Sequence, residues 1–292
     1  MGPGIKRIAI ATCAAFGDLK VDDQLLEKAL VERGVRPSPV VWDGEPLPWA
    51  WFDGCIVRST WDYHDKHAEF LAWTREAATQ TRFWNPPALI AWNSEKTYLR
   101  ELAEAGVPIV PTVWVGRGAG ADLEELLRGE GWEEAVVKPV VDLGARHLRR
   151  VRAGEESSAL ELALARSAEA MVQPFLPSLE VEGELSLIYV DGRFTHAVRK
   201  RPAPGDFRVQ SIWGGTVERV APGAAELEIA ERALAQIEEV PLYARADFVA
   251  GPEGGPCLIE LELIEPNLYL TEHPPAAAAL AEALLLRIDV DA

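Results

Sequence analysis

The sequence predicts two architectures in one chain: a small α/β domain with a parallel sheet, followed by an α+β region with antiparallel sheet. In roughly the first ninety residues, short apolar strands alternate with helical segments, a pattern typical of a parallel sheet covered by helices. The later residues contain two hairpin patterns instead. One spans residues 184–200 with Asp191 and Gly192 at its turn, and the other spans residues 246–263 with a turn rich in glycine and proline.

The elements of the N-terminal domain follow from their residue patterns. We expect strands at residues 6–12, 37–42 and 54–59, and helices at residues 22–33 and 64–78. The first helix should end before Gly34, because glycine suits the position that follows a helix terminus. The apolar run of the first strand is short and passes directly into a polar helical segment, so we expect a strand there and not a secretory signal.

Domain boundaries are placed where the residue pattern changes. Residues 84–93, WNPPALIAWN, are predicted to be a linker, because two prolines disfavour a helix. Asn93 would then cap a helix over residues 94–106. The predicted units are an N-terminal domain at residues 1–92, a first lobe at residues 93–172 and a C-terminal lobe at residues 173–292.

Composition excludes several classes of partner. The chain carries 29 Lys plus Arg against 46 Asp plus Glu, a formal charge of −17, which disfavours binding to nucleic acid or to an anionic membrane. No apolar stretch is long enough to span a membrane. The three cysteines have no metal-binding spacing and leave an odd count, which favours a reducing compartment. We expect a cytoplasmic protein, and the sequence leaves open whether it forms a homo-oligomer.

Carboxylates alternate with apolar residues in LIELELIEP, residues 258–266. Side chains two apart on a strand share a face, so Glu260 and Glu262 project together. The preceding strand of the hairpin carries Asp247, which can face both across the ladder. A solvated strand edge would explain two such charges, but three on neighbouring strands repel one another unless a cation lies between them. Ligation by oxygen alone suits Mg²⁺, which at nucleotide sites is shared with phosphates.

Basic side chains supply the complementary half of such a site. Four of the residues from Arg199 to Arg208 are basic, and a cluster of this kind can hold phosphate or carboxylate. A solvated strand face that balances the acidic surface is the alternative for this stretch. Lys138, in AVVKPV, lies inside an apolar strand, where lysine is rarely buried without an anion. Together with the three carboxylates, these residues predict a Mg-nucleotide site.

The order of several motifs resembles that of the ATP-grasp superfamily over residues 93–270. In chain order they are NSEKTYLREL around Lys96, VVKP, VQPFL ahead of GELSL, RKRPAPGDFRVQSIWGG, RAD and IELEL. RSTWDY, FWNPPALIAWN and GDFRVQ further resemble the ATP-grasp group that includes the ligase closing the ring of D-cycloserine. The resemblance implies a two-lobed ATP-grasp fold after the N-terminal domain, with ATP and Mg²⁺ as cofactors.

The resemblance also implies roles for individual residues. The groups that would bind ATP are Lys96 and Lys138 at the phosphates, Gln173, Phe175 and Leu176 at the adenine, partly through their backbone, and Glu184 at the ribose. The Mg²⁺ ligands would be Asp247, Glu260 and Glu262. The catalytic side chains would be Arg245, which stabilises charge at the transferred phosphoryl and acyl groups, and Lys200 and Arg208, which face the substrate carboxylate or the γ-phosphate.

Two positions depart from the superfamily pattern. Glu262 stands where relatives commonly have asparagine, which makes this site more negative. The loop after Lys138 carries only Gly144 where a phosphate-covering loop is often glycine-rich, and Arg146 or His147 could contribute there instead.

Four residues after a predicted parallel strand are candidates for substrate binding: Arg58, Trp61, Asp62 and Tyr63. Open α/β sheets bind their ligands at this end of their strands. Packing is the alternative role for Trp61 and Tyr63, because both are large aromatic residues.

The implied activity is ATP-dependent ligation of a small-molecule carboxylate to an amine, through an acyl phosphate, on an amino-acid-like substrate. Positioning and charge stabilisation would do most of the work, so no catalytic Ser, Cys or His is required. Two alternatives use the same apparatus, namely a small-molecule kinase and a nucleotide-binding protein that has lost its chemistry. ADP release that requires both an acid and an amine would favour the ligase.

Overall fold

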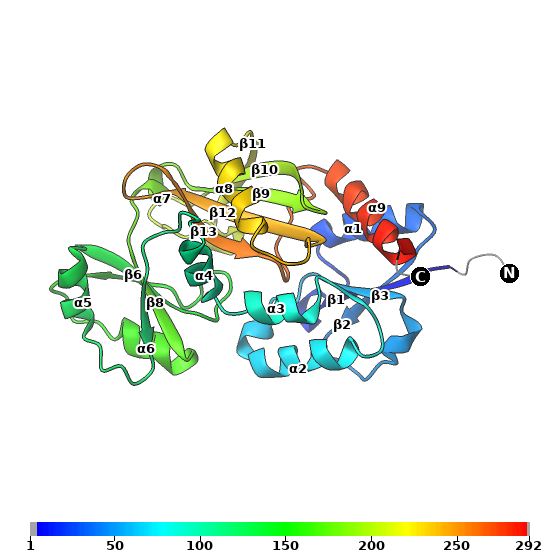
Figure 1. Cartoon of the computed structure of the whole chain (residues 1–292), viewed down its shortest axis with the longest axis horizontal. Helices are drawn as coiled ribbons and strands as arrows, with labels where there is room; N and C mark the ends of the chain where they lie inside the picture. Colours follow the sequence, from blue (N-terminus) through cyan, green and yellow to red (C-terminus); the bar gives the residue numbers. More distant parts are fainter. Residues whose placement is uncertain (1–4, 291–292) are drawn as a thin grey trace.

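In the computed structural model, which describes residues 5–290, three β-sheets follow one another along the molecule (Figure 1). The N-terminal sheet is parallel throughout. Its strands, in spatial order, are β2 (Arg36–Val41), β1 (Arg7–Thr12), β3 (Gly54–Val57) and β4 (Phe83–Trp84). The predicted parallel sheet is therefore confirmed.

Helices cover both faces of the N-terminal sheet. They are α1 (Val21–Glu32), α2 (His67–Ala77), α3 (Pro87–Asn93) and α9 (Pro275–Val290). Along β1, Ile8 and Ile10 pack with α1 and α9, whereas Ala9 and Ala11 face a cluster that includes Phe70 of α2. This alternation is the period of two that a strand buried on both faces requires. As predicted, α1 ends just before Gly34, which has a φ of +77°.

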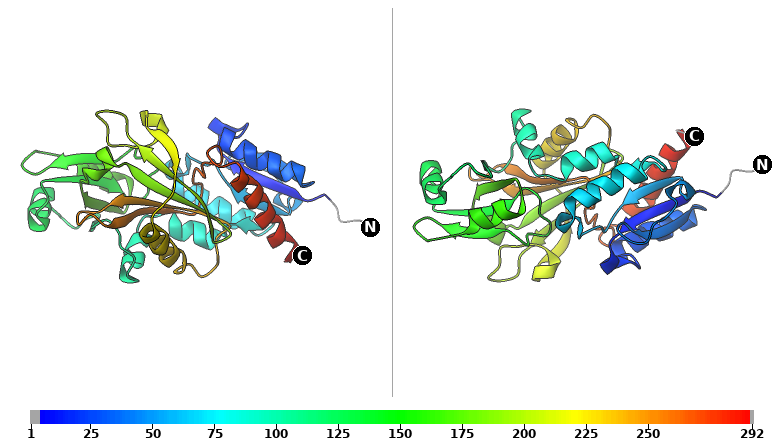
Figure 2. Two further views of the ribbon diagram at one scale, coloured as in Figure 1. Left: turned by 90° about the horizontal axis from the view of Figure 1, so that it is seen from above. Right: turned by 90° about the horizontal axis from the view of Figure 1, so that it is seen from below.

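The C-terminal helix α9 belongs by sequence to the last unit, but it packs on the first. Leu280 and Leu284 of α9 share a buried cluster with Leu26 and Leu30 of α1. Figure 2 shows α9 and α1 together at one end of the molecule. Burial of apolar surface between the two helices therefore holds α9 against the N-terminal domain.

Residues 84–93 are not a linker, contrary to the prediction. Pro86 is the N-cap of α3 and Pro87 is its first residue, where the missing backbone N–H would have had no helical partner. The prolines therefore begin the helix. Asn93 ends α3 and does not cap α4 (Tyr98–Glu104). Its side chain instead donates to Leu261 O and accepts from Leu263 N, both at 2.8 Å.

The central sheet is antiparallel and contains both predicted hairpins. Its strands, in spatial order, are β11 (Thr216–Val220), β10 (Arg193–Arg201), β9 (Glu184–Val190), β12 (Tyr243–Ala250) and β13 (Pro256–Glu262). Asp191 and Gly192 turn the first hairpin with φ values of 51° and 71°, as a type I′ turn demands. In the second hairpin, Arg245 pairs with Glu262 and Asp247 pairs with Glu260. This register places the carboxylates of the two strands opposite one another.

The third sheet forms a separate lobe with its own core (Figure 1). Its antiparallel strands are β5 (Val113–Gly116), β8 (Glu169–Pro174), β6 (Glu134–Pro139) and β7 (Arg149–Arg152). Two helices, α5 (Leu123–Glu130) and α6 (Ala159–Arg166), pack against it. The remaining helices, α4, α7 (Ser178–Val181) and α8 (Ala224–Leu234), lie along the central sheet.

Buried polar groups join the N-terminal sheet to the central sheet. The side chain of Asn85 donates to the carbonyls of Tyr243 and Leu263 at 3.0 and 2.7 Å. The Tyr243 hydroxyl lies 2.7 Å from Val57 O and 2.8 Å from Ile264 O. Such buried, satisfied contacts fix the two sheets in one orientation. Among residues 5–290, no helix is long and apolar enough to cross a membrane.

Gly54 begins β3 directly against Trp84, which leaves no room for a side chain. A Cβ built there would lie 2.6 Å from Cη2 of the Trp84 ring. We expect Gly54→Ala to lower the free energy of unfolding by about 1–3 kcal/mol, because both residues are buried and the ring must move. Urea denaturation measures the change.

Gly116→Ala is the matched control, since a Cβ at Gly116 would meet no atom within 4 Å. A variant of Gly54 as stable as this control would contradict the tight contact.

Candidate active site

Three carboxylates converge on the hairpin of β12 and β13. Asp247 is buried, while Glu260 and Glu262 are half-buried at the opposing strand. One oxygen from each residue lies within 4.8 Å of the others. The expectation that these side chains face one another is therefore met, and the set offers the oxygen-only ligands that Mg²⁺ prefers.

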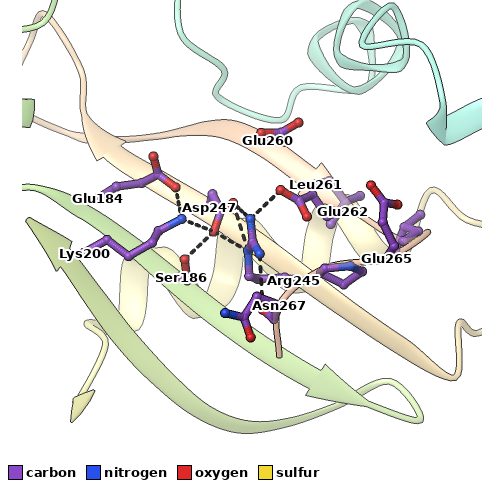
Figure 3. A network of polar contacts seen from close by, with 12 residues as sticks. Glu184, Ser186, Lys200, Arg245, Asp247, Glu260, Leu261, Glu262, Glu265 and Asn267 are labelled. Carbon is purple, nitrogen blue, oxygen red and sulfur yellow. Dashed lines mark hydrogen bonds and ion pairs between the residues drawn. The ribbon is translucent and has the colours of Figure 1, made fainter. Parts of the chain in front are cut away.

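Basic side chains hold each of these carboxylates, and Figure 3 shows the contacts of Arg245 and Lys200. Arg245 donates to both oxygens of Asp247, with Nη2 2.7 Å from Oδ2, and also bonds Glu262. Lys96 Nζ lies 3.0 Å from Glu260 Oε1. Lys200 bonds Glu184 and lies 3.4 Å from Asp247 Oδ1. Burial makes these pairs interdependent, because an unpaired charge in the interior is costly.

Burial and neighbouring charges separate the pKa values of these groups. Burial raises the pKa of Glu262 to about 7 against the opposing effect of Arg245. Burial would also raise the pKa of Asp247, but Arg245 and Lys200 outweigh it and lower that pKa to about 2. Burial lowers the pKa of Lys138 to about 8. Strongly perturbed groups gathered in one place are typical of a functional site.

A cavity of ≈ 750 Å³ lies over this cluster and is lined by all three parts of the molecule. The N-terminal domain contributes Cys13, Phe16, Lys20, Trp61 and Asp62; the central sheet contributes Glu184, Lys200, Arg245, Asp247, Glu260 and Glu262; the lobe and its connections contribute Lys96, Lys138, Gln173, Gly144 and Arg146. Cys13 follows β1 and Trp61 follows β3, the adjacent strands from which the sheet extends in opposite directions. Ligands of open α/β sheets bind at such a point.

Two loops meet over the cavity. Gly144, in the loop after Lys138, accepts a hydrogen bond from Trp213 Nε1 at 3.1 Å. Arg208 is salt-bridged to Asp206, and its guanidinium stacks 3.6 Å from the centroid of the Trp213 ring. Trp213 therefore contacts both Gly144 and Arg208 and joins the two loops at the cavity.

The residues predicted for this loop and for the adenine differ in their placement. Arg146 lines the cavity, whereas His147 does not and is bonded to Asp142 at 2.7 Å. Gln173 lines the cavity, but Phe175 and Leu176 do not. The guanidinium carbon of Arg150 lies over the Phe175 ring, 3.4 Å from the centroid of that ring. The expected contact of Phe175 and Leu176 to adenine, partly through their backbone, stays a prediction.

Two of the four expected substrate residues, Arg58 and Tyr63, do not line this cavity. Arg58 is only 2% exposed, donates to Asp23 Oδ1 and to Pro266 O at 2.8 Å each, and does not line the cavity. Tyr63 is buried and stacks on Phe70 with centroids 4.7 Å apart. The side chains of both residues pack between elements, but Tyr63 also lines a small hollow together with Lys96 and Glu260. Contact of Arg58 and Tyr63 with a substrate therefore stays a prediction.

Lys20, Glu265 and Tyr269 are among the cavity residues that were not anticipated from the sequence. Lys20 Nζ lies 3.4 Å from the centroid of Trp61, whose Nε1 donates to Glu265 O at 3.0 Å. Tyr269 lines the cavity with a φ of +50°, which is unusual for a bulky residue. Lys20 had no local signal beyond its place after the first strand. Glu265 and Tyr269 follow the carboxylate strand directly, and this proximity was the available signal.

Comparisons with known proteins agree with this geometry. The family model "D-cycloserine synthetase DcsG, N-terminal domain" matches residues 8–85, and "Prokaryotic glutathione synthetase, ATP-grasp domain" matches residues 109–247. The cycloserine biosynthesis protein DcsG of Streptomyces lavendulae is 30% identical, over 96% of this chain and 98% of that protein. The glutathione synthetase of Prochlorococcus marinus (strain MIT 9313) is 32% identical, over 70% of this chain and 63% of that protein.

Solved structures give the same result. The crystal structure of D-cycloserine synthetase DcsG superposes with a TM-score of 0.87 at 28% identity, covering 97% of this chain and 99% of the other. The D-alanine–D-alanine ligase of Bacillus anthracis shares the fold, with a TM-score of 0.65 at 14% identity over 97% of this chain and 96% of the other. Fold and site thus define an ATP-grasp ligase, the class of enzyme that forms carbon–nitrogen bonds. Within this class, the chain belongs to the family of the cycloserine biosynthesis protein DcsG.

The buried pair of Lys200 and Glu184 should be essential for stability. We expect Lys200→Met to lower the free energy of unfolding by about 3–5 kcal/mol, because it leaves the Glu184 carboxylate buried without its cation. The double variant Lys200→Met/Glu184→Gln should recover a large part of this loss. Urea denaturation of parent, single and double variants tests the coupling, and a double variant no more stable than Lys200→Met would contradict it.

Proposed function

We propose that this protein is an ATP- and Mg²⁺-dependent ligase that joins the carboxylate of an amino-acid-like substrate to a nitrogen nucleophile. The observation that carries the proposal is the joint placement, in one cavity, of three carboxylates suited to a metal and lysines suited to phosphates. The membership of the chain in the DcsG family supports the choice of an amino-acid-like substrate.

The three carboxylates fit a magnesium ion, because they offer the oxygen ligands that this ion prefers. Glu260 and Glu262 reach the cavity with carboxylate oxygens, and Asp247 supplies a third oxygen from the adjacent strand. Arg245 already bonds Asp247, so the carboxylate is held ionised and oriented. When bound, the ion would neutralise charge on the phosphates and help to position them.

The basic residues divide the work of phosphoryl transfer. Lys96 and Lys138 would hold the phosphates of ATP, and Gln173 and Glu184, which line the same cavity, would bind the adenine and the ribose. Arg245 and Lys200 would stabilise the charge that develops on the transferred phosphoryl group. Arg208 would add to this charge stabilisation once it leaves its salt bridge with Asp206.

The reaction would proceed in two steps, phosphoryl transfer to the carboxylate and displacement of phosphate by the nitrogen. A substrate carboxylate oxygen attacks the γ-phosphorus in line, and the bond to the bridging oxygen of ADP breaks, which gives an acyl phosphate and ADP. The nitrogen nucleophile then attacks the acyl carbon, phosphate leaves with the electron pair of the C–O bond, and the nitrogen loses a proton. The loops around Gly144 and Trp213 would exclude water, which otherwise hydrolyses the acyl phosphate.

Removal of one carboxylate tests the metal assignment. We expect Glu260→Gln to lower Mg²⁺-dependent ATP turnover at least about 100-fold, because even an outer-shell partner of a metal ligand is worth 10- to 100-fold. Glu253→Gln is the matched control, since it removes the same charge from the exposed turn of the same hairpin. Thermal denaturation of both variants checks that they fold. Turnover by Glu260→Gln equal to that of the control would contradict the assignment.

The substrates are found by an ADP-release screen of amino acids and their O-substituted analogues, alone and in pairs. We expect release that requires a carboxylate with a nitrogen nucleophile, whether the nitrogen is on the same molecule or on a second one. Release supported by a substrate with a hydroxyl and no reacting carboxylate would show a kinase instead.

A further inference from the structure

Glu265 is a buried carboxyl group without a partner. The residue is only 4% exposed, yet it lines the cavity together with Glu260 and Glu262. Among residues 5–290, no hydrogen bond or salt bridge reaches its side chain, and Figure 3 shows it beyond Glu262 with no contact drawn to it. A buried carboxyl group of this kind is unusual, because buried acidic groups are nearly always paired.

The nearby cations are already engaged. Lys96 pairs with Glu260 and donates to Asp142 O at 2.6 Å, and Arg245 bonds Asp247 and Glu262. Each carboxylate of the predicted metal site therefore has a basic partner. Glu265 has none within the described part of the chain, so it is free to meet a cation that arrives with a ligand.

The backbone around Glu265 is fixed from both sides. Ile264 O accepts from the Tyr243 hydroxyl at 2.8 Å, Glu265 O accepts from Trp61 Nε1 at 3.0 Å, and Pro266 O accepts from Arg58 Nη2 at 2.8 Å. Three consecutive carbonyls are thus held by side chains of other elements. The carboxyl group is consequently presented to the cavity by a rigid frame, as a binding group should be.

A lysine lines the same cavity beside Trp61. Lys20 Nζ rests on the Trp61 ring and makes no salt bridge among residues 5–290. Its charge would repel a second cation from the ring of Trp61 on which it rests. Lys20 thus disfavours a cationic group of a ligand beside itself, whereas the carboxyl group of Glu265 can accept one.

We propose that Glu265 is the specificity-determining residue that binds the ammonium group of an α-amino acid substrate, an inference that rests on the proposed function. In an α-amino acid a single carbon separates ammonium and carboxylate. An ammonium held by Glu265 therefore leaves the carboxylate beside Glu262 and Arg245, where phosphoryl transfer would take place. Binding also removes the cost of an unpaired buried carboxyl group, which gives preference over acids that lack the amine.

The test compares substrates with and without the amine. Each amino acid that supports ADP release is paired with its 2-hydroxy acid counterpart, and both are assayed with the parent and with Glu265→Gln. We expect the variant to lose about 10- to 100-fold in kcat/KM on the amino acid, mainly through KM, because a charge-assisted hydrogen bond is removed. On the 2-hydroxy acid, parent and variant should agree within about 2-fold, since the lost group had no cation to meet.

Control measurements separate Glu265 from the metal site. The KM for ATP and the Mg²⁺ concentration that gives half-maximal rate should be the same in Glu265→Gln, in the parent and in the control variant Glu253→Gln. A shift in the Mg²⁺ dependence would make Glu265 a metal ligand and overturn the inference. An equal loss on the amino acid and on the 2-hydroxy acid would overturn it as well.

Binding measurements distinguish failure of this inference from failure of the proposed function. Calorimetry first measures binding of Mg²⁺ with a non-hydrolysable ATP analogue to the parent, which tests the nucleotide site alone. Serine, alanine and the amino acids of the screen are then titrated into that complex, each against its 2-hydroxy acid. Preferential binding of an amino acid that is lost in Glu265→Gln supports the inference. Bound nucleotide with no preference for any amino acid overturns it and leaves the nucleotide site standing.

Discussion

The guanidinium of Arg245 is the contact on which the site depends. From β12 it bonds Asp247 on its own strand and Glu262 on β13, so it joins the two strands whose carboxylates converge. Without this cation, like charges would face one another in a buried place, and the hairpin that carries them would repel itself. The same contact holds Asp247 ionised, as a metal ligand must be. Arg245 thus both stabilises the hairpin and keeps Asp247 in the ionised form that a metal ion requires.

The parts of the molecule divide the cavity according to their chemistry. The central sheet provides the carboxylates, the separate lobe provides Lys138 and Gln173, and the N-terminal domain provides an aromatic wall at Trp61 with Lys20 on its face. Asn85 and Tyr243 fix the N-terminal sheet to the central sheet, whereas the lobe has its own core. These contacts fix the N-terminal side of the cavity relative to the carboxylates of the central sheet. The loop that follows β6 of the lobe contacts the loop between β10 and β11 through the hydrogen bond from Trp213 to Gly144.

Local patterns predicted those parts of the site that depend on neighbours in sequence. The period of two along β13 and the hairpin turn sufficed to bring Glu260, Glu262 and Asp247 together. The prediction of a linker at Pro86 and Pro87 was wrong, because proline disrupts the interior of a helix but is well suited to its first turn. The sequence pattern alone did not show that α3 begins there. Contacts over long separations escaped prediction. Glu265 O and Pro266 O receive hydrogen bonds from residues 204 and 208 positions away, and these bonds decide both the role of Arg58 and the direction of Glu265.

The position of a metal ion tests the central claim most directly. Crystals grown with Mn²⁺ in place of Mg²⁺ and a non-hydrolysable ATP analogue allow the ion to be located by its anomalous scattering. The account predicts a peak within bonding distance of carboxylate oxygens of Glu260, Glu262 and Asp247, next to the phosphates of the analogue. A nucleotide bound in the cavity with its metal held elsewhere, while these three residues keep only their basic partners, would contradict it.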